Sequence, residues 1–164
     1  MAVAAALALL AGPARAEDAN RALIEGCIVA AAHVHRVPPA LIVILLDVEG
    51  GALGRVSPNT NGTVDVGPMQ VNQIWLPQVA RHWGTTRDRA FRALRDSFCA
   101  NVEAGTWILR QSLDEARGDF WEGVATYHSH DPDHRRPYLR SVLRQVLRLR
   151  AQRDGKVAAA AVGD

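Results

Sequence analysis

The chain has 164 residues, of which 48% are hydrophobic and 22% are charged, and its formal net charge is +2 at neutral pH. This length predicts one domain with a single core, and nothing in the composition requires a second domain. The small net charge by itself says little about partners. Neither a recognition motif nor basic stretches interleaved with aromatic residues are present, so we expect no nucleic-acid partner.

The first sixteen residues, MAVAAALALLAGPARA, predict a secretory signal peptide. The stretch is apolar and ends on Ala14-Arg15-Ala16, which matches the A-x-A cleavage pattern, so we expect cleavage before Glu17. The usual basic n-region is missing, and the alternative is an ordinary apolar N-terminal helix. No later run approaches the ~20 apolar residues that span a bilayer. We therefore expect a periplasmic protein without a transmembrane segment in its mature form.

The chain has two cysteines, Cys27 and Cys99. An even number of cysteines in an exported protein favours a disulfide over a metal site or a reactive thiol. The alternative is two separate buried thiols. One helical face is predicted to carry Leu23, Ile24, Cys27, Ile28 and Ala31, which indicates a first amphipathic helix with Cys27 on its buried side.

The stretch LIVILLDVEGG, residues 41–51, predicts a second and strongly apolar helix. Pro38 and Pro39 suit its first turn, and Gly50 and Gly51 suit its end. So short an apolar run is also compatible with a buried strand, but the leucines and the flanking residues favour a helix. We expect the two glycines to leave room for a ligand beside the helix end.

Residues 52–66 are rich in Gly, Asn, Ser, Thr and Pro and contain the turn signal NTNG. We expect a small irregular or β-hairpin element there. The remaining helices are expected over residues 71–80, 87–95, 98–116, 120–127 and 137–150. The low-complexity residues 154–164 are expected to be a disordered tail. The sequence thus predicts one mainly α (α+β) domain over residues 17–153.

Glu49 ends the apolar helix and shares a helical face with Ile42, Leu45 and Leu46, whereas Asp47 points elsewhere. Apolar surroundings disfavour the ionised carboxylate, so the pKa of Glu49 is expected to rise. A carboxylic acid that keeps its proton near neutral pH can act as a general acid. The alternative is a glutamate that frays into solvent at the helix end.

The segment NTNGTVDVGPMQVNQIW brings several short polar groups close to Glu49 in the sequence. Asp65, Gly67, Gln70 and Asn72 provide a carboxylate, a point of close backbone approach and two amide side chains. Such a set suits a groove that binds the hydroxyl and acetamido groups of a sugar polymer. The residues therefore indicate a carbohydrate-active hydrolase.

Four ordered motifs, VEGG, DVGPMQVN, CANVEAG and ATYHS, give the sequence a family resemblance. From about Cys27 to about Tyr138 it resembles the lysozyme-like lytic transglycosylases of the SLT type. It is most similar to the small exported members associated with type IV secretion and conjugation. The resemblance implies a lysozyme-like fold, peptidoglycan as the substrate, no cofactor and no metal. It also implies partners in a secretion, conjugation or pilus machine.

The resemblance assigns roles to six residues. It implies that Glu49 is the catalytic acid and base, and that Gln70, Asn72 and Tyr127 line the glycan groove. Met69 and Asn101 match supporting positions. In this family one carboxylate suffices, because the muramoyl C6 hydroxyl attacks C1 and closes a 1,6-anhydro ring.

Two positions depart from the family pattern. A third position, Asp65, is compatible with two different reactions. Gly50 replaces a frequent serine, and Pro68 replaces a leucine and removes one backbone donor. Asp65 is expected to bind substrate, but it also matches the second carboxylate of animal-type lysozymes. A retaining hydrolase needs two carboxyl groups about 5 to 5.5 Å apart. The alternatives are therefore a hydrolytic lysozyme using Glu49 and Asp65, or a non-catalytic peptidoglycan-binding scaffold.

Three further patterns have ordinary interpretations. His128, His130 and His134 are dense enough for a metal site, but a polar loop that closes the groove is favoured. An arginine row at positions 136, 140, 144 and 148 predicts a solvated helix face that also suits anionic groups of the wall or of lipids. Among the tryptophans, Trp75 is the candidate for the groove, and the other three are expected in the core.

Overall fold

The computed structural model describes the backbone of residues 13–162 and the side-chain environment of residues 15–155. Its helices are α1 (Pro13–His35), α2 (Pro39–Glu49), α3 (Leu76–His82), α4 (Arg87–Asp96), α5 (Phe98–Glu115), α6 (Phe120–His128) and α7 (Pro132–Val162). A three-stranded antiparallel sheet is formed by β1 (Val56–Pro58), β2 (Val64–Val66) and β3 (Val71–Asn72). The prediction of a mainly α domain with a small β-hairpin element beside the second helix is confirmed.

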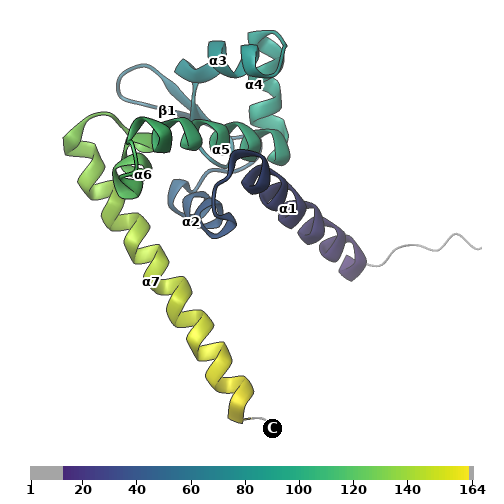
Figure 1. Ribbon diagram of the computed structural model, residues 1–164. Helices are drawn as coiled ribbons and strands as arrows, with labels where there is room; N and C mark the ends of the chain where they lie inside the picture. The colour runs from purple at the N-terminus through teal and green to yellow at the C-terminus, as the bar shows by residue number, and fades with distance from the viewer. Residues whose placement is uncertain (1–12, 163–164) are drawn as a thin grey trace, which may run out of the picture.

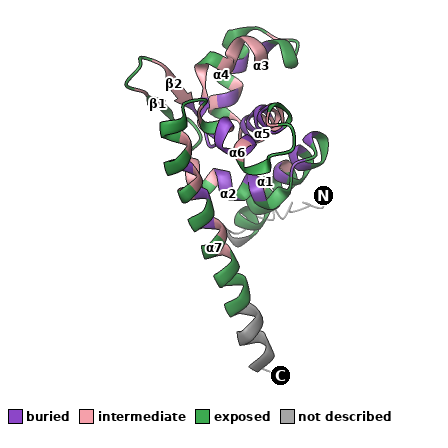
Figure 2. Cartoon of the chain, turned by 60° about the vertical axis from the view of Figure 1, so that its left-hand side comes forward, coloured by how far each residue is buried: buried purple, intermediate pink, exposed green. Residues whose placement is uncertain are grey.

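Helix α5 is the central element of the fold (Figure 1). It packs against α1, α4 and α6, and α6 in turn packs against α7. Its side chains Val102 and Leu109 are fully buried, as are Ile42 and Leu45 of α2. Figure 2 shows that the buried residues lie where these helices face one another, whereas most of α7 is exposed.

Helix α2 begins and ends where the local sequence predicts. Pro39 occupies the first turn, where its missing N–H costs no hydrogen bond. Gly50 ends the helix in the left-handed conformation, with φ of 60°, and its N–H donates to the carbonyl of Leu46 at 3.2 Å. This end places Glu49 at the last helical position.

The prediction of a helix over residues 71–80 is wrong at its start. Val71 and Asn72 pair instead with Val66 and Asp65 of β2. The Asn72 side chain then accepts a hydrogen bond from the N–H of Ile74 and starts the short 3₁₀ helix η1 (Gln73–Trp75). Because Pro77 is tolerated only in a first turn, α3 begins at Leu76.

The two ends of the chain differ from the expectations in part. Helix α7 continues to Val162 through most of the expected disordered tail, residues 154–164, because its last residues are mainly alanine, the strongest helix former. At the other end, α1 begins at Pro13 and includes Ala14–Ala16. Residues 1–12 of the expected signal peptide lie outside the described residues.

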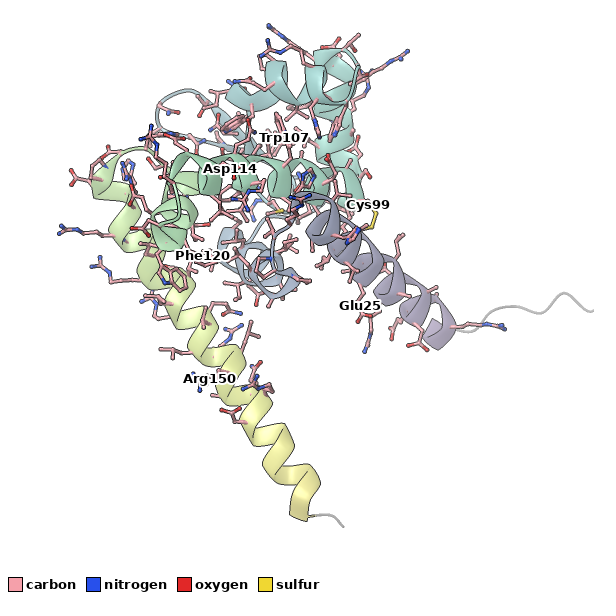
Figure 3. All side chains as sticks on the ribbon, viewed as in Figure 1. Glu25, Cys99, Trp107, Asp114, Phe120 and Arg150 are labelled. Carbon is pink, nitrogen blue, oxygen red and sulfur yellow. A yellow bond between two sulfur atoms is a disulfide. The ribbon has the colours of Figure 1, made fainter. Side chains whose placement is uncertain are left out.

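A disulfide joins Cys27 of α1 to Cys99 at the start of α5 (Figure 3). The two Cα atoms are 5.0 Å apart, although 72 positions separate the residues in the sequence. The bond therefore fixes α1 to the central helix.

Among the described residues, no single helix is both long and apolar enough to cross a membrane. Helices α1 and α2 meet this criterion only as a pair, across a bend of 117°. Core helices and signal sequences meet the same criterion, and four residues of α2 are buried in the core.

Candidate active site

A polar groove of about 570 Å³ lies between the end of α2, the small sheet and the segment that follows α6. All five residues predicted for catalysis or substrate binding line it, namely Glu49, Asp65, Gln70, Asn72 and Tyr127. Residues of the β1–β2 turn, Asn59 to Asn61, form one edge. The structure thus brings together groups that the sequence distributes over five elements and turns.

Glu49 is a half-buried residue of the groove lining and follows the core residues Ile42 and Leu45 on α2. Its pKa is raised from about 4.5 to about 7, chiefly because burial disfavours the charged carboxylate. A hydrogen bond from Tyr138 partly lowers this pKa, and the negative charge of Asp65 raises it. A substantial fraction of Glu49 therefore carries a proton near neutral pH.

Tyr138 completes the surroundings of Glu49 and was not among the predicted site residues. Its hydroxyl donates a hydrogen bond to Oε1 of Glu49 at 2.7 Å. Its ring stacks on His128, with centroids 4.2 Å apart and planes at 5°. Burial, followed by the charge of Glu49, raises the pKa of Tyr138, so the phenol stays protonated and remains a donor.

A sequence signal for Tyr138 existed but was weak. It is the only Phe, Trp or Tyr in the arginine-rich stretch from 132 to 162. Its burial follows from its place on the same face as Val142, which is also buried. Nothing in the sequence, however, indicates that this face meets Glu49.

Asp65 and Asn72 form a pair because β2 and β3 place them opposite each other. The amide nitrogen of Asn72 donates to Oδ1 of Asp65 at 2.7 Å and to the hydroxyl of Thr63 at 2.9 Å. These bonds fix the orientation of Asn72 and leave the second oxygen of Asp65 for a ligand. The sheet therefore positions one carboxylate and one amide at the groove wall.

Gln70 lies in a tight loop that connects β2 to β3. Its own φ is 48°, a left-handed conformation that few residues other than glycine adopt. Its side-chain nitrogen donates to the carbonyl of Gly67 at 2.7 Å. Gly51 packs directly against this loop, because a Cβ at position 51 would collide with the carbonyls of Gly67 and Pro68. Gly51 thus provides room for the loop, and the expectation that it leaves room for a ligand is wrong.

Met69 and Asn101 support the groove from below. Asn101 is fully buried on α5, and its Oδ1 accepts the N–H of Met69 at 2.7 Å. Its Nδ2 donates to the carbonyls of Val66 and Leu94, each at 2.9 Å. The hydroxyl of Tyr127 donates to the carbonyl of Met69 at 3.1 Å, so the loop is fixed from two sides.

The histidines around the junction of α6 and α7 form a wall of the groove. His128, His130 and His134 all line it, but only His130 lies in the connecting loop, because His128 ends α6 and His134 belongs to the first turn of α7. Within the described residues these three histidines form no group with convergent ligand atoms. Burial, followed by the neighbouring His134, lowers the pKa of His128, so this ring is mostly neutral at neutral pH.

The tryptophans divide between groove, core and surface. Trp75 lines the groove, and its ring meets Trp107 edge to face with centroids 6.4 Å apart. Trp83 and Trp107 are partly buried against the core. The expectation that Trp121 belongs to the core is wrong, because it is 43% exposed.

A mainly α domain in which a protonated carboxylic acid faces a polar groove has the architecture of a lysozyme-like glycan-cleaving enzyme. Residues 26–140 match the model of the Transglycosylase SLT domain. Because this range covers most of the chain and includes Glu49 and Tyr138, the chain belongs to that family. Membership supports lytic transglycosylase activity on peptidoglycan and confirms the family predicted from the motifs. Curated proteins give no significant match to the chain.

Proposed function

We propose that the protein cleaves the β-1,4 bond between N-acetylmuramic acid and N-acetylglucosamine and leaves a 1,6-anhydro end, with Glu49 as the acid and base. The observation that carries this proposal is that Glu49, whose pKa is raised to about 7, lines a groove of about 570 Å³ together with Asp65 and Gln70. A group with this pKa can give up a proton and take one back at neutral pH.

The reaction needs one carboxyl group in two successive roles. Glu49 protonates the glycosidic oxygen as the bond from C1 of the muramoyl sugar breaks, and the N-acetylglucosamine hydroxyl departs. The resulting carboxylate takes the proton from the muramoyl C6 hydroxyl, whose oxygen attacks C1. The ring closes, Glu49 regains its proton, and no water is consumed.

The other groove residues support this reaction by charge and orientation. The charge of Asp65 suits the positive charge that develops at C1, because the transition state resembles an oxocarbenium ion. Gln70 keeps its side-chain oxygen and one N–H for the acetamido and hydroxyl groups of the glycan, whereas Asn72 uses both of its N–H groups on Asp65 and Thr63 and so positions the Asp65 carboxylate at the groove wall. The hydroxyl of Tyr138 holds Oε1, which leaves Oε2 of Glu49 to carry the transferred proton.

The cellular setting is a proposal that rests on the N-terminal sequence and on the motif resemblance. The signal-like residues 1–16 and the disulfide suit export to the periplasm. We assign residues 17–153 to the transglycosylase domain and expect it to open the wall locally for a secretion, conjugation or pilus machine.

Product analysis tests the chemistry. Wild-type enzyme acting on purified peptidoglycan should release anhydromuramoyl products, which mass spectrometry finds one water lighter than the hydrolytic products. Glu49→Gln should lower the rate by roughly 10² to 10⁴-fold, because the proton donor is lost. Asp47→Asn is the matched control, since Asp47 lies on the same helix, is exposed and accepts a bond from Gln145.

Two outcomes would contradict the proposal. Reducing muramic ends without anhydro products would show a hydrolytic lysozyme, in which Asp65 acts as the second carboxylate. Binding to peptidoglycan with no cleavage by the wild type would show a scaffold.

A further inference from the structure

A second cluster of titratable side chains lies outside the groove and plays no part in the proposed reaction. It consists of His35 at the end of α1, His82 at the end of α3, and Glu103 on α5. The Nε2 atoms of both histidines lie 2.9 Å from the same oxygen, Oε1 of Glu103. Three helices that are far apart in the sequence thus direct one ligand atom each to a common point.

The geometry of this cluster suits a small divalent metal ion. The three ligand atoms lie within 4.8 Å of one another. Around a tetrahedral Zn²⁺, ligands at 2.0 to 2.1 Å are about 3.3 Å apart. The two nitrogen to oxygen distances of 2.9 Å are therefore within a few tenths of an ångström of the required spacing. Small rotations of the side chains would admit the ion.

The chemistry and the surroundings of the cluster also suit a metal. Hydrogen bonds converge on the Glu103 carboxylate from His35, His82 and Trp83. Trp83 donates its indole N–H to Oε2 at 2.6 Å and leaves Oε1 for the metal. His82 stacks on Trp107 with centroids 4.4 Å apart and planes at 8°, which fixes its ring. In metal sites, contacts of this kind from residues that do not bind the metal themselves orient the ligand side chains.

The site is open on one side and closed on the other. The side chain of His35 is 7% exposed, whereas those of His82 and Glu103 are each 30% exposed. An ion can therefore enter past His82 and Glu103 and keep a water molecule as its fourth ligand. Two imidazoles and one carboxylate favour Zn²⁺ over Mg²⁺ or Ca²⁺, which prefer oxygen ligands.

We propose that His35, His82 and Glu103 form a binding site for one Zn²⁺ ion that joins α1, α3 and α5. The site lies beside the groove without contributing to it. Trp107 stacks on His82 and meets Trp75, which lines the groove. A metal that fixes His82 therefore also supports the wall of the groove at Trp75.

Calorimetric titration of the untagged full chain with Zn²⁺ alone tests the proposal. The wild type should bind one equivalent, and its unfolding midpoint should rise with Zn²⁺ because the ion binds only the folded state. Glu103→Gln and His82→Ala should each weaken binding by roughly tenfold or more. Affinity should fall as the pH is lowered, since protons compete for the imidazoles. His33→Ala is the matched control, because His33 is exposed on α1 two positions before His35.

Two results would overturn the proposal. One is the lack of saturable Zn²⁺ binding by the wild type. The other is wild-type affinity in both Glu103→Gln and His82→Ala, which would place the ion elsewhere, for example at the histidines of the groove. Co²⁺ provides a second measurement, because its visible spectrum distinguishes four-coordinate from six-coordinate geometry. The wild type should give the intense four-coordinate bands, and Glu103→Gln should not. If Glu103→Gln does not fold, His82→Ala still allows the comparison, because the His82 side chain is 30% exposed.

Discussion

Glu49 has three neighbours that act on its carboxyl group in different directions. The apolar core raises its pKa by removing water, Tyr138 lowers the pKa by donating to the carboxylate, and Asp65 raises it by its charge. The resulting value of about 7 is thus a balance that single substitutions can shift both ways. The kinetics of the enzyme should report these shifts.

Tyr138→Phe and Asp65→Asn should move the pH profile in opposite directions. The proposed mechanism requires protonated Glu49, so activity should fall as the pH rises above about 7. Tyr138→Phe removes the donor that favours the charged form, so the alkaline limb of kcat/KM should move to higher pH. Asp65→Asn removes a repelling charge, so the limb should move to lower pH. Tyr127→Phe is the control, because the Tyr127 hydroxyl donates to Met69 and not to Glu49. Shifts in the same direction for both variants would contradict this account.

Glu49 should also make the stability of the fold depend on pH. Its pKa is about 7 in the folded state and about 4.5 when exposed, so the folded state binds this proton more tightly. The stabilisation is complete below pH 4.5 and is lost as the pH rises through 7. The free energy of unfolding of Glu49→Gln, minus that of the wild type, should increase by about 3 kcal/mol from pH 4.5 to pH 8. Urea denaturation at both pH values measures this difference. The prediction would be contradicted if this difference were the same at both pH values, or if Asp47→Asn showed the same increase with pH.

Helix α5 supports the groove without lining most of it. Asn101 and Gly105, one turn apart, face the loop that carries Met69 and Gln70. Asn101 accepts the N–H of Met69 in the loop and donates to the carbonyls of Val66 at the end of β2 and Leu94 of α4. Gly105 leaves the space that the Met69 side chain fills. The precision of the groove therefore depends on the packing of one helix face.

Gly105→Ala should destabilise the protein, whereas Gly26→Ala should not. A Cβ at position 105 would lie 2.6 Å from the sulfur of Met69, which forces the loop to move. We expect a loss of about 1 to 3 kcal/mol and reduced activity. A Cβ at position 26 of α1 meets nothing within 4 Å, so the alanine should gain up to about 1 kcal/mol through helix propensity. Urea denaturation and lytic rates of both variants test these expectations. A Gly105→Ala protein as stable and as active as the wild type would contradict the expected loss.

The sequence predicted elements well where the signals were local and poorly where they were not. The bounds of α2 follow from Pro39 and Gly50, which lie at its own ends. Val71 and Asn72 were predicted as helix because their strand conformation depends on pairing with β2. Tyr138 was missed for the same reason, since its contact with Glu49 spans 89 positions. Asp65, Gln70 and Asn72, which the motif singles out, do line the groove, although their hydrogen bonds could not be predicted from the motif.

At the scale of the whole molecule, the disulfide and the long last helix define two different regions. Near Cys99 the disulfide fixes α1 to α5. The far part of α7 extends away from the body, with its arginine row largely in solvent (Figures 1 and 2). The expectation of a solvated basic face is therefore confirmed for Arg136, Arg140, Arg144 and Arg148.

Removing the disulfide should lower stability without changing the groove. A loop of 72 positions gives about 4 kcal/mol in the chain-entropy model. The Cys27→Ala, Cys99→Ala double variant should lose free energy of unfolding of this order, and its lytic rate at 25 °C should stay near that of the wild type. The wild type under reducing conditions should behave in the same way. Unchanged stability in both cases would contradict the prediction.

The contact between Tyr138 and Glu49 also imposes an order on the maturation of the site. Glu49, Asp65, Gln70, Asn72 and Tyr127 all precede α7 in the chain, and Tyr138 is 89 positions behind Glu49. At typical synthesis rates this interval corresponds to roughly 5 to 20 seconds. A product truncated before α7 would carry all five residues predicted for catalysis or substrate binding and lack the hydroxyl that holds the acid. If Glu49 is the acid, as proposed, a protein of this peptidoglycan-cleaving family thus completes the surroundings of its proton donor only when its last helix has been made and folded.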